Sequence, residues 1–203
     1  MHREIFTEEQ LQLLPSVEKF SRSFYLVGGT AIALHLGHRR SIDFDLFTSV
    51  TLAKKRIRDK TSKIPFKKVL LFEDVDQIHL LINGVKVTFF QFPYPIAHPE
   101  KLDKCITLPT LLTLSAMKAF ALGRRAKWKD YVDLYFILRD HYSIADICRE
   151  GKACFGELFS EKMLRQQLAF HKDIDYTEQV EFIGSPIPAT QIREFLIARA
   201  TEI

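Results

Sequence analysis

The sequence predicts a mixed α+β protein, with a β-sheet and its helices in the first hundred residues and a helical region after them. Strand-like apolar segments recur between residues 24 and 92, bounded by glycine-containing turns. Pro93, Pro95 and Pro99 mark a change in composition, beyond which apolar residues recur at helical spacing. We therefore expect a sheet-containing core at 1–100 and a helical region at 101–203 that packs on this core.

The core reads as an opening helix followed by strands and turns. A helix is expected at 7–20, because Thr7 and Gln10 have the spacing of a capping box. A buried strand at 24–27 leads into a glycine turn and a short helix at 31–36, which Thr30 caps and Gly37 ends. The other expected elements are a strand at 41–47, a basic helix and loop at 54–68, strands at 69–72 and 77–82, an Asn83-Gly84 hairpin turn, and a strand at 85–92.

The second half has the 3.6-residue periodicity of amphipathic helices. Helices are expected at 111–122, 127–139, 157–170 and 189–201, with a polar stretch at 173–185 before the last.

Composition and charge narrow the class of protein. Hydrophobic residues make up 47% of the chain and charged residues 27%, which is typical of globular proteins. The first residues form no apolar signal core, and no apolar run approaches the roughly 18 residues that span a bilayer. Three cysteines without a CxxC pair favour a reducing compartment and no zinc site. We expect a cytoplasmic protein. Its net charge of +4 suits a polyanionic ligand or none at all.

Asp43 and Asp45 are the strongest candidates for chemistry. They lie one residue apart on an expected strand, so both project from the face opposite Ile42, Phe44 and Leu46. Two unpaired carboxylates repel each other, and a hard divalent cation such as Mg²⁺ would remove that conflict. A lone D-x-D is a weak signal, and a solvated strand face is the ordinary alternative.

The Gly28-Gly29 turn strengthens the case for a site. It lies between a buried strand and a helix N-terminus, where free backbone N–H groups can hold phosphate oxygens. A plain tight turn is the alternative. Together, the turn and the aspartates combine a phosphate cradle with a metal pair.

Residues 27–47, VGGTAIALHLGHRRSIDFDLF, resemble the signature of the AbiEii-type nucleotidyltransferases, toxin-like proteins of abortive-infection and toxin–antitoxin operons. Lys118 and the segment Lys129-Asp130-Tyr131-Val132-Asp133 are similar, more loosely, to the helical lysine and K-D-x-x-D helix of that family. The resemblance implies a DNA polymerase β-like nucleotidyltransferase fold. It also implies transfer of a nucleoside monophosphate from an NTP, with Mg²⁺ or Mn²⁺, to an RNA such as a tRNA end or to a protein, and an antitoxin partner.

The resemblance assigns roles to particular residues. The implied catalytic residues are Asp43, Asp45, Lys118 and Asp130, of which Asp43 and Asp45 bind the metal. The implied nucleotide-binding residues are Gly28, Gly29, Thr30, Arg39, Ser41, Lys118 and Lys129. On physical grounds, a lysine on the apolar helix 111–122 needs a carboxylate or phosphate partner, or else extends outward to solvent. Lys129 and Asp133 are four residues apart and can equally form a surface ion pair.

Thr88 departs from the pattern, because it stands where the third carboxylate of such enzymes is expected. The alternative is therefore a catalytically degenerate nucleotide- or RNA-binding module with the same fold. Glu73, Asp74 or Asp76 can approach the cleft from the neighbouring hairpin, although a solvated loop is their expected setting. The basic residues between 54 and 68 either line an RNA-binding rim or form an ordinary soluble helix face.

Overall fold

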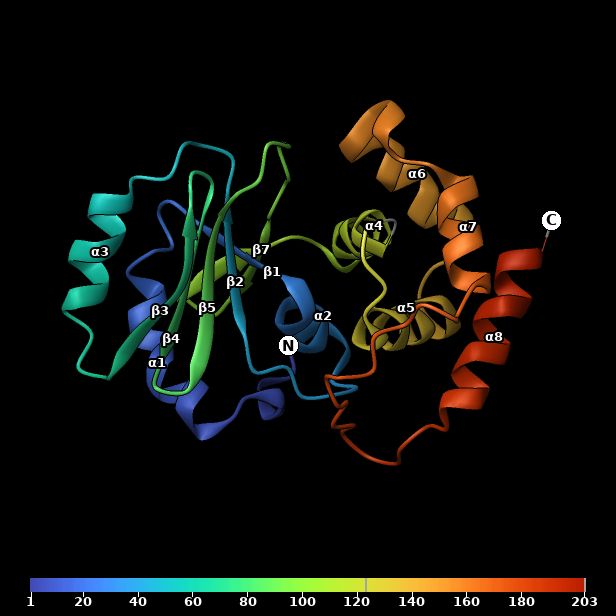
Figure 1. Ribbon diagram of the computed structural model, residues 1–203, viewed down its shortest axis with the longest axis horizontal. Coiled ribbons are helices and arrows are strands. Elements are labelled where there is room, and N and C mark those ends of the chain that lie inside the picture. The colour runs from blue at the N-terminus through green and yellow to red at the C-terminus, as the bar shows by residue number, and fades with distance from the viewer. Residues whose placement is uncertain (123, 203) are drawn as a thin grey trace.

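A computed structural model describes residues 1–122 and 124–202 and places a β-sheet beside a group of C-terminal helices (Figure 1). The sheet has five strands in the order β1-β2-β5-β4-β3. β2 and β5 are parallel, and the other neighbouring strands are antiparallel. The strands are β1 Tyr25–Val27, β2 Phe44–Thr48, β3 Lys68–Asp74, β4 Gln77–Ile82 and β5 Val85–Gln91. This mixed sheet with its helices confirms the predicted α+β class.

The two faces of the sheet have different surroundings. Phe44 and Leu46 on β2, and Phe89 on β5, are buried on one face. On that face the Phe89 ring lies 4.8 Å from the ring of Phe20, which follows helix α1 (Glu8–Glu18). Asp45 lies on the other face, which Phe47 and Phe90 share. Helix α2 (Gly28–Leu36) lies between the sheet and the C-terminal helices (Figure 1).

The capping box predicted for the first helix and the predicted Asn83-Gly84 hairpin turn are both confirmed. The Thr7 side chain accepts a hydrogen bond from the Gln10 N–H, and the Gln10 side chain accepts one from the Thr7 N–H. Asn83 and Gly84 both have positive φ, as a two-residue type I′ hairpin requires. The basic segment forms helix α3 (Lys54–Ser62) and a loop that leads to β3, as predicted for 54–68.

Two boundaries near Asp43 were predicted wrongly. Helix α2 begins at Gly28, so Thr30 lies inside the helix and is not its cap. β2 begins at Phe44, and Ile42 is 49% exposed instead of facing the core. The cause is that the Ser41 carbonyl accepts hydrogen bonds from the Gln10 amide at 2.9 Å and from the Thr30 hydroxyl at 3.2 Å. These bonds hold the chain before β2 in a loop.

The helical region contains two elements that the sequence did not predict. Helix α6 was missed because its apolar face includes Cys148 and Gly151, and its capping box uses Asp146 where Glu or Gln is usual. The small hairpin β6-β7 contacts β1. The elements after residue 99 are β6 Glu100–Leu102, β7 Ile106–Leu108, α4 Leu111–Leu122, α5 Trp128–Asp140, α6 Ile144–Phe155, α7 Glu161–Ala169 and α8 Ala189–Thr201. Short 3₁₀ turns lie at Arg3–Ile5 and Gly156–Leu158.

The other helices follow the prediction closely. The bounds of α4 and α8 are the predicted ones, and α7 starts at Glu161 because the Ser160 side chain caps it. Within the described chain, no helix combines the length and hydrophobicity needed to cross a bilayer.

Candidate active site

Asp45 lies on the face of β2 opposite the buried side chains of Phe44 and Leu46. Asp43 stands two residues earlier, just before the strand begins. We call these two residues the aspartate pair. Both are partly buried, and the part of the chain that the structure describes gives neither of them an ion-pair partner within 4 Å.

The aspartate pair is held in an unfavourable electrostatic state. The pKa of Asp43 is raised, mainly by burial and then by the neighbouring charge of Asp45. The pKa of Asp45 is also raised by burial, although Lys86, a hydrogen bond with Thr88 and the charge of Arg125 oppose the effect. Both ionised carboxylates therefore lack a compensating cation in close contact.

Gly28 allows the backbone to pass directly over Asp45. Its φ of +73° is left-handed, and a Cβ atom built there would overlap the Asp45 carboxylate oxygen Oδ2. Helix α2 starts at this glycine, and no side chain caps its first turn. The unbonded N–H groups of a helix N-terminus thus begin beside a carboxylate of the pair.

Thr30 and Ser41 hold the loop in front of β2. The buried Thr30 hydroxyl lies 3.1 Å from Ser41 Oγ and also donates to the backbone carbonyl of Asp43. These bonds fix the position of Asp43 relative to α2. The sequence resemblance gave both hydroxyls a nucleotide-binding role, but their hydrogen bonds here are internal.

A cavity of about 510 Å³ separates Asp45 from helix α4. Gly28 and Asp45 line one side, and Lys118 and Arg125 line the other. The charges of Arg125 and Lys118 both lower the pKa of Asp45, so they act across this space. We call this space the aspartate cavity. Asp43 stands beside it and is not part of its lining.

Much of the lining of the aspartate cavity is aromatic. Aromatic and other apolar side chains from β2, β5, the segment after β5 and α4 form its wall. They include Phe47, Phe90, Phe92, Tyr94 and Phe120. The cavity therefore combines a few charged groups with an apolar lining, as sites for small organic ligands commonly do.

Lys118 is buried and belongs to a network of ion pairs. Its ammonium donates to Asp130 Oδ1 at 2.7 Å and lies 3.0 Å from Asp133 Oδ2. Arg125 contacts Asp130 from the cavity side at 3.0 Å. Burial opposes ionisation of Asp130, but Lys118 and Arg125 keep its pKa below the usual value. Lys118 thus faces the cavity with its charge already shared between two carboxylates.

Asp133 lies at the centre of this network. Arg39 donates to its two carboxylate oxygens, from Nε at 2.7 Å and Nη2 at 2.9 Å. His38 Nε2 adds a contact of 2.8 Å to Oδ1. Although burial opposes it, Arg39 and Lys118 hold the pKa of Asp133 well below its usual range. We call the set of His38, Arg39, Lys118, Asp130 and Asp133 the buried ion network, which the exposed Arg125 joins through its contact with Asp130.

Arg39 does not fit the nucleotide-binding role that the resemblance implied. Only 1% of the residue is exposed, and its guanidinium forks onto Asp133 underneath Gly29. A Cβ atom at Gly29 would lie 2.7 Å from Arg39 Nη2, so the second glycine makes room for this arginine. Arg39 ties the loop between α2 and β2 to helix α5.

The suggested surface pair of Lys129 and Asp133 is wrong. Asp133 is fully buried in the network, and Lys129 instead contacts Glu178 Oε2 at 3.0 Å. Lys127 pairs with the same carboxylate, and these contacts lower the pKa of Glu178 to about 2. The polar stretch at 173–185 therefore packs back against the start of α5.

The register of β2 and β5 places Thr88 directly beside Asp45. Asp76 lines the aspartate cavity from the turn between β3 and β4, whereas Glu73 binds Arg58 and Lys54 of α3. In residues 1–122 and 124–202 no three His, Cys, Asp or Glu side chains are grouped as a metal site. The position beside Asp45 is thus filled by a hydroxyl.

The donors of the aspartate pair suit a hard divalent cation. Two carboxylate groups that lack cations are ligands of the type that Mg²⁺ takes, with water and phosphate oxygens completing its shell. The sequence interpretation gave no catalytic or ligand-binding role to four residues that lie at the cavity or in the ion network: Arg124, Arg125, Asp133 and His38. The H-R and D-x-x-D motifs contained a signal for the last two, because buried charges occur in pairs.

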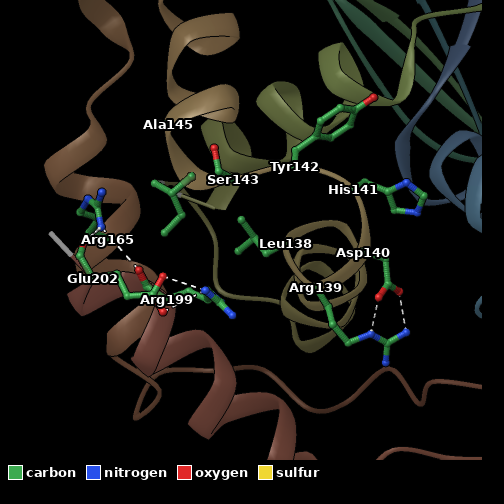
Figure 2. Close-up of a pocket in the computed structure, with 11 residues that line it drawn as sticks. Leu138, Arg139, Asp140, His141, Tyr142, Ser143, Ala145, Arg165, Arg199 and Glu202 are labelled. Atoms are coloured by element: carbon green, nitrogen blue, oxygen red, sulfur yellow. Dashed lines mark hydrogen bonds and ion pairs between the residues drawn. The ribbon is translucent and has the colours of Figure 1, made fainter.

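A second cavity of about 550 Å³ lies among α5, α6, α7 and α8, away from the aspartate pair (Figure 2). Its arginines are already paired: Arg139 with Asp140, and Arg199 with Glu202. Arg165 binds Glu161 and carbonyl groups at the end of α8. This cavity lacks the uncompensated charge found at the aspartate pair.

Comparison with known proteins identifies the family. The family described as "Nucleotidyl transferase AbiEii toxin, Type IV TA system" matches residues 12–104, which include the aspartate pair and Gly28. An uncharacterized protein of Aquifex aeolicus (strain VF5), aq_aa25, is 35% identical over 143 residues. That match spans 66% of this chain and 68% of the Aquifex protein.

Solved structures share the fold at low sequence identity. A candidate nucleotidyltransferase from H. pylori has a TM-score of 0.59 and 11% identity, covering 95% of this chain and 91% of that one. MenT4, a nucleotidyltransferase toxin from Mycobacterium tuberculosis H37Rv, has a TM-score of 0.59 and 13% identity, covering 96% of this chain and 85% of that one. The chain has the nucleotidyltransferase fold and belongs to the AbiEii family of nucleotidyl transferase toxins.

Proposed function

We propose that this protein is a Mg²⁺-dependent nucleotidyltransferase that moves a nucleoside monophosphate from an NTP to an RNA or protein acceptor. The observation that carries the proposal is the uncompensated Asp45, with Asp43 two residues before it, which faces Lys118 and Arg125 across the aspartate cavity. This arrangement supports a cation beside the aspartates and an anionic group between that cation and the two basic side chains. A metal-bound nucleotide has both charges.

Each wall of the cavity takes one part of the substrate. The N–H groups at the start of α2, at Gly28 and Gly29, bind triphosphate oxygens. Arg125 and Lys118 neutralise phosphate charge from the opposite wall. The aromatic side chains of the cavity wall, which include Phe47 and Tyr94, surround the nucleobase. Residues 1–100 thus supply one wall of the site, and residues 101–203 supply the other.

The reaction is an in-line displacement at the α-phosphorus. The acceptor hydroxyl oxygen forms a bond to that phosphorus, the bond to the bridging oxygen of the β-phosphate breaks, and pyrophosphate leaves with the electron pair. The hydroxyl proton passes to water. A divalent cation held by Asp43 and Asp45 supplies charge neutralisation at the phosphates. Asp130 is a positioning residue, because its carboxylate orients Lys118 and Arg125 toward the cavity.

The biological setting that we propose is a cytoplasmic toxin–antitoxin pair. Family membership supports an antitoxin partner. Direct roles for Thr30, Ser41 and Lys129 are not part of this proposal, since Thr30 and Ser41 form internal hydrogen bonds and Lys129 pairs with Glu178.

Thr88 beside Asp45 favours a second candidate, a module that binds nucleotide and does not transfer it. The test is incubation with each of the four α-³²P-labelled NTPs, Mg²⁺ or Mn²⁺, and either total RNA or protein extract. We expect label on one acceptor class, with the label lost in Asp45→Asn and kept in Arg149→Gln, an exposed residue on α6. Metal-dependent binding without transfer would establish the module. The absence of both binding and transfer would refute both functions.

A further inference from the structure

The positive charge of this protein is concentrated in one short segment. Residues 54–68 contain eight lysines and arginines against the single acid Asp59, so the segment carries a formal charge of +7. The whole chain carries +4, which leaves −3 for all the other residues together. The net positive charge is therefore a local property of α3 and the loop that follows it.

Helix α3 presents this charge to solvent. The helix is anchored by Ile57 and Thr61, its two buried residues. Lys54 and Arg58 reach Glu73 on β3, and the Lys68 ammonium binds backbone carbonyl groups. Among the described residues, no acid pairs with Lys55, Arg56, Lys63 or Lys67.

Like charges crowd together on this surface. Arg56, Lys60 and Lys63 follow one another at helical spacing, so they share one side of α3. The Lys60 ammonium lies 5.1 Å from the centre of the Phe20 ring, and burial together with Arg56 and Arg22 lowers its pKa. We call the set of Arg22, Lys55, Arg56, Lys60 and Lys63 the α3 basic surface.

The order of charges along α3 works against helix stability. Lys54, Lys55 and Arg56 occupy the first turn, where the helix dipole favours acids. No acid lies in that turn, and Ala53 provides no side-chain cap. A helix face selected for solubility alone would gain from acidic residues at these positions, so the basic run indicates an external anion.

The α3 basic surface and the aspartate cavity are separate places that both reach the end of β2, where Phe47 lines the cavity and Thr48 lies beside the basic side chains. Arg56 and Lys60 line a hollow together with Thr48, the last residue of β2. The Thr48 carbonyl accepts a hydrogen bond from the N–H of Phe92, which lines the aspartate cavity. Figure 1 shows the chain passing from the end of β2 over this end of the sheet to α3. A ligand that contacts both places has to extend past the end of β2, as a polymer can.

We propose that the α3 basic surface binds the phosphate backbone of an RNA whose end enters the aspartate cavity. The inference rests on the proposed function in taking RNA as the acceptor class. Lysine and arginine contacts to phosphates dominate such binding and release counterions, which makes the affinity strongly salt-dependent. The α3 basic surface thus holds the body of the acceptor, while the aspartate cavity holds its reactive end.

The test measures RNA binding directly, without turnover. Fluorescence anisotropy of 5′-fluorescein-labelled bulk tRNA is followed between 50 and 200 mM NaCl for the wild type and the triple variant Lys55→Glu, Arg56→Glu, Lys63→Glu. A matched control, Lys152→Glu, Lys162→Glu, Lys172→Glu, makes the same charge change at exposed positions of the helical region. We expect the α3 triple to weaken binding about tenfold or more and to lower the salt slope by about 2–3, as three lost phosphate contacts require. The control should stay within about twofold of the wild type.

Several results would overturn the inference. Equal weakening by both triples would show a general effect of net charge, and no weakening by the α3 triple would place the RNA elsewhere. Displacement of the tRNA by poly-L-glutamate as effectively as by unlabelled tRNA would assign the surface to an acidic protein. If the glutamate triple does not fold, the corresponding glutamine triple should weaken binding about three- to tenfold.

The binding assay separates this inference from the proposed function. A protein that binds tRNA through α3 and transfers no label would uphold the α3 surface and refute the transferase. A protein that labels RNA equally well with or without the α3 cations would refute the α3 surface alone.

Discussion

The molecule contains two pairs of aspartates in opposite electrostatic states. Asp43 and Asp45 lie one residue apart at a strand, and Asp130 and Asp133 lie three residues apart on a helix, so each spacing brings two carboxylates together. The pKa values of the first pair are raised, and those of the second pair are lowered. The second pair is balanced by cations inside the fold. The balance for the first pair must come from outside it.

We expect the largest effect on stability when a carboxylate that is paired with buried cations is removed. Asp133→Asn leaves Arg39 and Lys118 buried with one fewer counter-charge, and we expect the free energy of unfolding to fall by about 3–5 kcal/mol. Urea denaturation measures this loss. Asp140→Asn is the control on the same helix, since its pair with Arg139 is exposed and should contribute less than about 1 kcal/mol. Similar losses in both variants would show that the network has no special role.

The contact between Gly28 and Asp45 gives the next largest effect. Gly28→Ala combines a left-handed φ with an overlap on Asp45, whereas Gly84→Ala has a left-handed φ of +78° and no atom within 4 Å. We expect thermal unfolding to show a loss of about 1–2 kcal/mol for Gly84→Ala and a clearly larger loss for Gly28→Ala. Adding Asp45→Ala should recover part of the Gly28→Ala loss. No recovery would mean that the two residues do not touch.

Removing a carboxylate that has no paired cation should instead stabilise the protein. Without metal at pH 7.5, Asp45→Asn should raise the free energy of unfolding by about 1 kcal/mol, because an uncompensated carboxylate is deleted from a functional site. In the wild type, the raised pKa makes the folded state bind more protons than the unfolded one, so stability falls as pH rises through that pKa. The advantage of Asp45→Asn should therefore shrink as pH is lowered toward the unfolded value near 3.8. Urea denaturation at pH 7.5 and 5 measures both effects, and a variant less stable than the wild type at pH 7.5 would contradict them.

A smaller effect is expected from adding a third acid. Thr88 pairs in register with Asp45, so Thr88→Asp places a new carboxylate next to the aspartate pair. We expect calorimetry to show Mg²⁺ binding several-fold tighter, since more ligand charge strengthens binding of hard cations. Without metal the variant should be less stable by about 1 kcal/mol. The control is Thr107→Asp in the β6-β7 hairpin, which should leave Mg²⁺ affinity unchanged.

The sequence predicted the class of fold because its signals are local. The capping box of Thr7 and Gln10, the Asn83-Gly84 turn and the apolar periodicity of α4 each act within a few residues, and all three were confirmed. The start of β2 was predicted three residues too early, because the Ser41 carbonyl is held by side chains from α1 and α2. Alternation of apolar residues contains no information about such contacts.

The site was harder to predict because its partners are distant in sequence. Arg39 and Asp133 are 94 residues apart, and Lys129 pairs with Glu178 from a segment that reads as a loop. Motif resemblance selected Arg39 and Lys129 as ligand-binding residues, but only the three-dimensional structure separates a cation that is enclosed in the fold, such as Arg39, from one that is exposed at the cavity, such as Arg125. Asp43 and Asp45 could be proposed from sequence since their proximity follows from the period of a strand.

Calorimetric titration of an NTP, with and without Mg²⁺, tests most directly whether the aspartate pair is balanced by a metal-bound nucleotide. The titration compares the wild type with Asp43→Asn, Asp45→Asn and the double variant. We predict that binding requires Mg²⁺, that each single variant loses at least about tenfold in affinity, and that the double variant loses little more than the weaker-binding single, because both carboxylates serve one cation. Binding that persists without Mg²⁺ and is unchanged by either substitution would contradict the account.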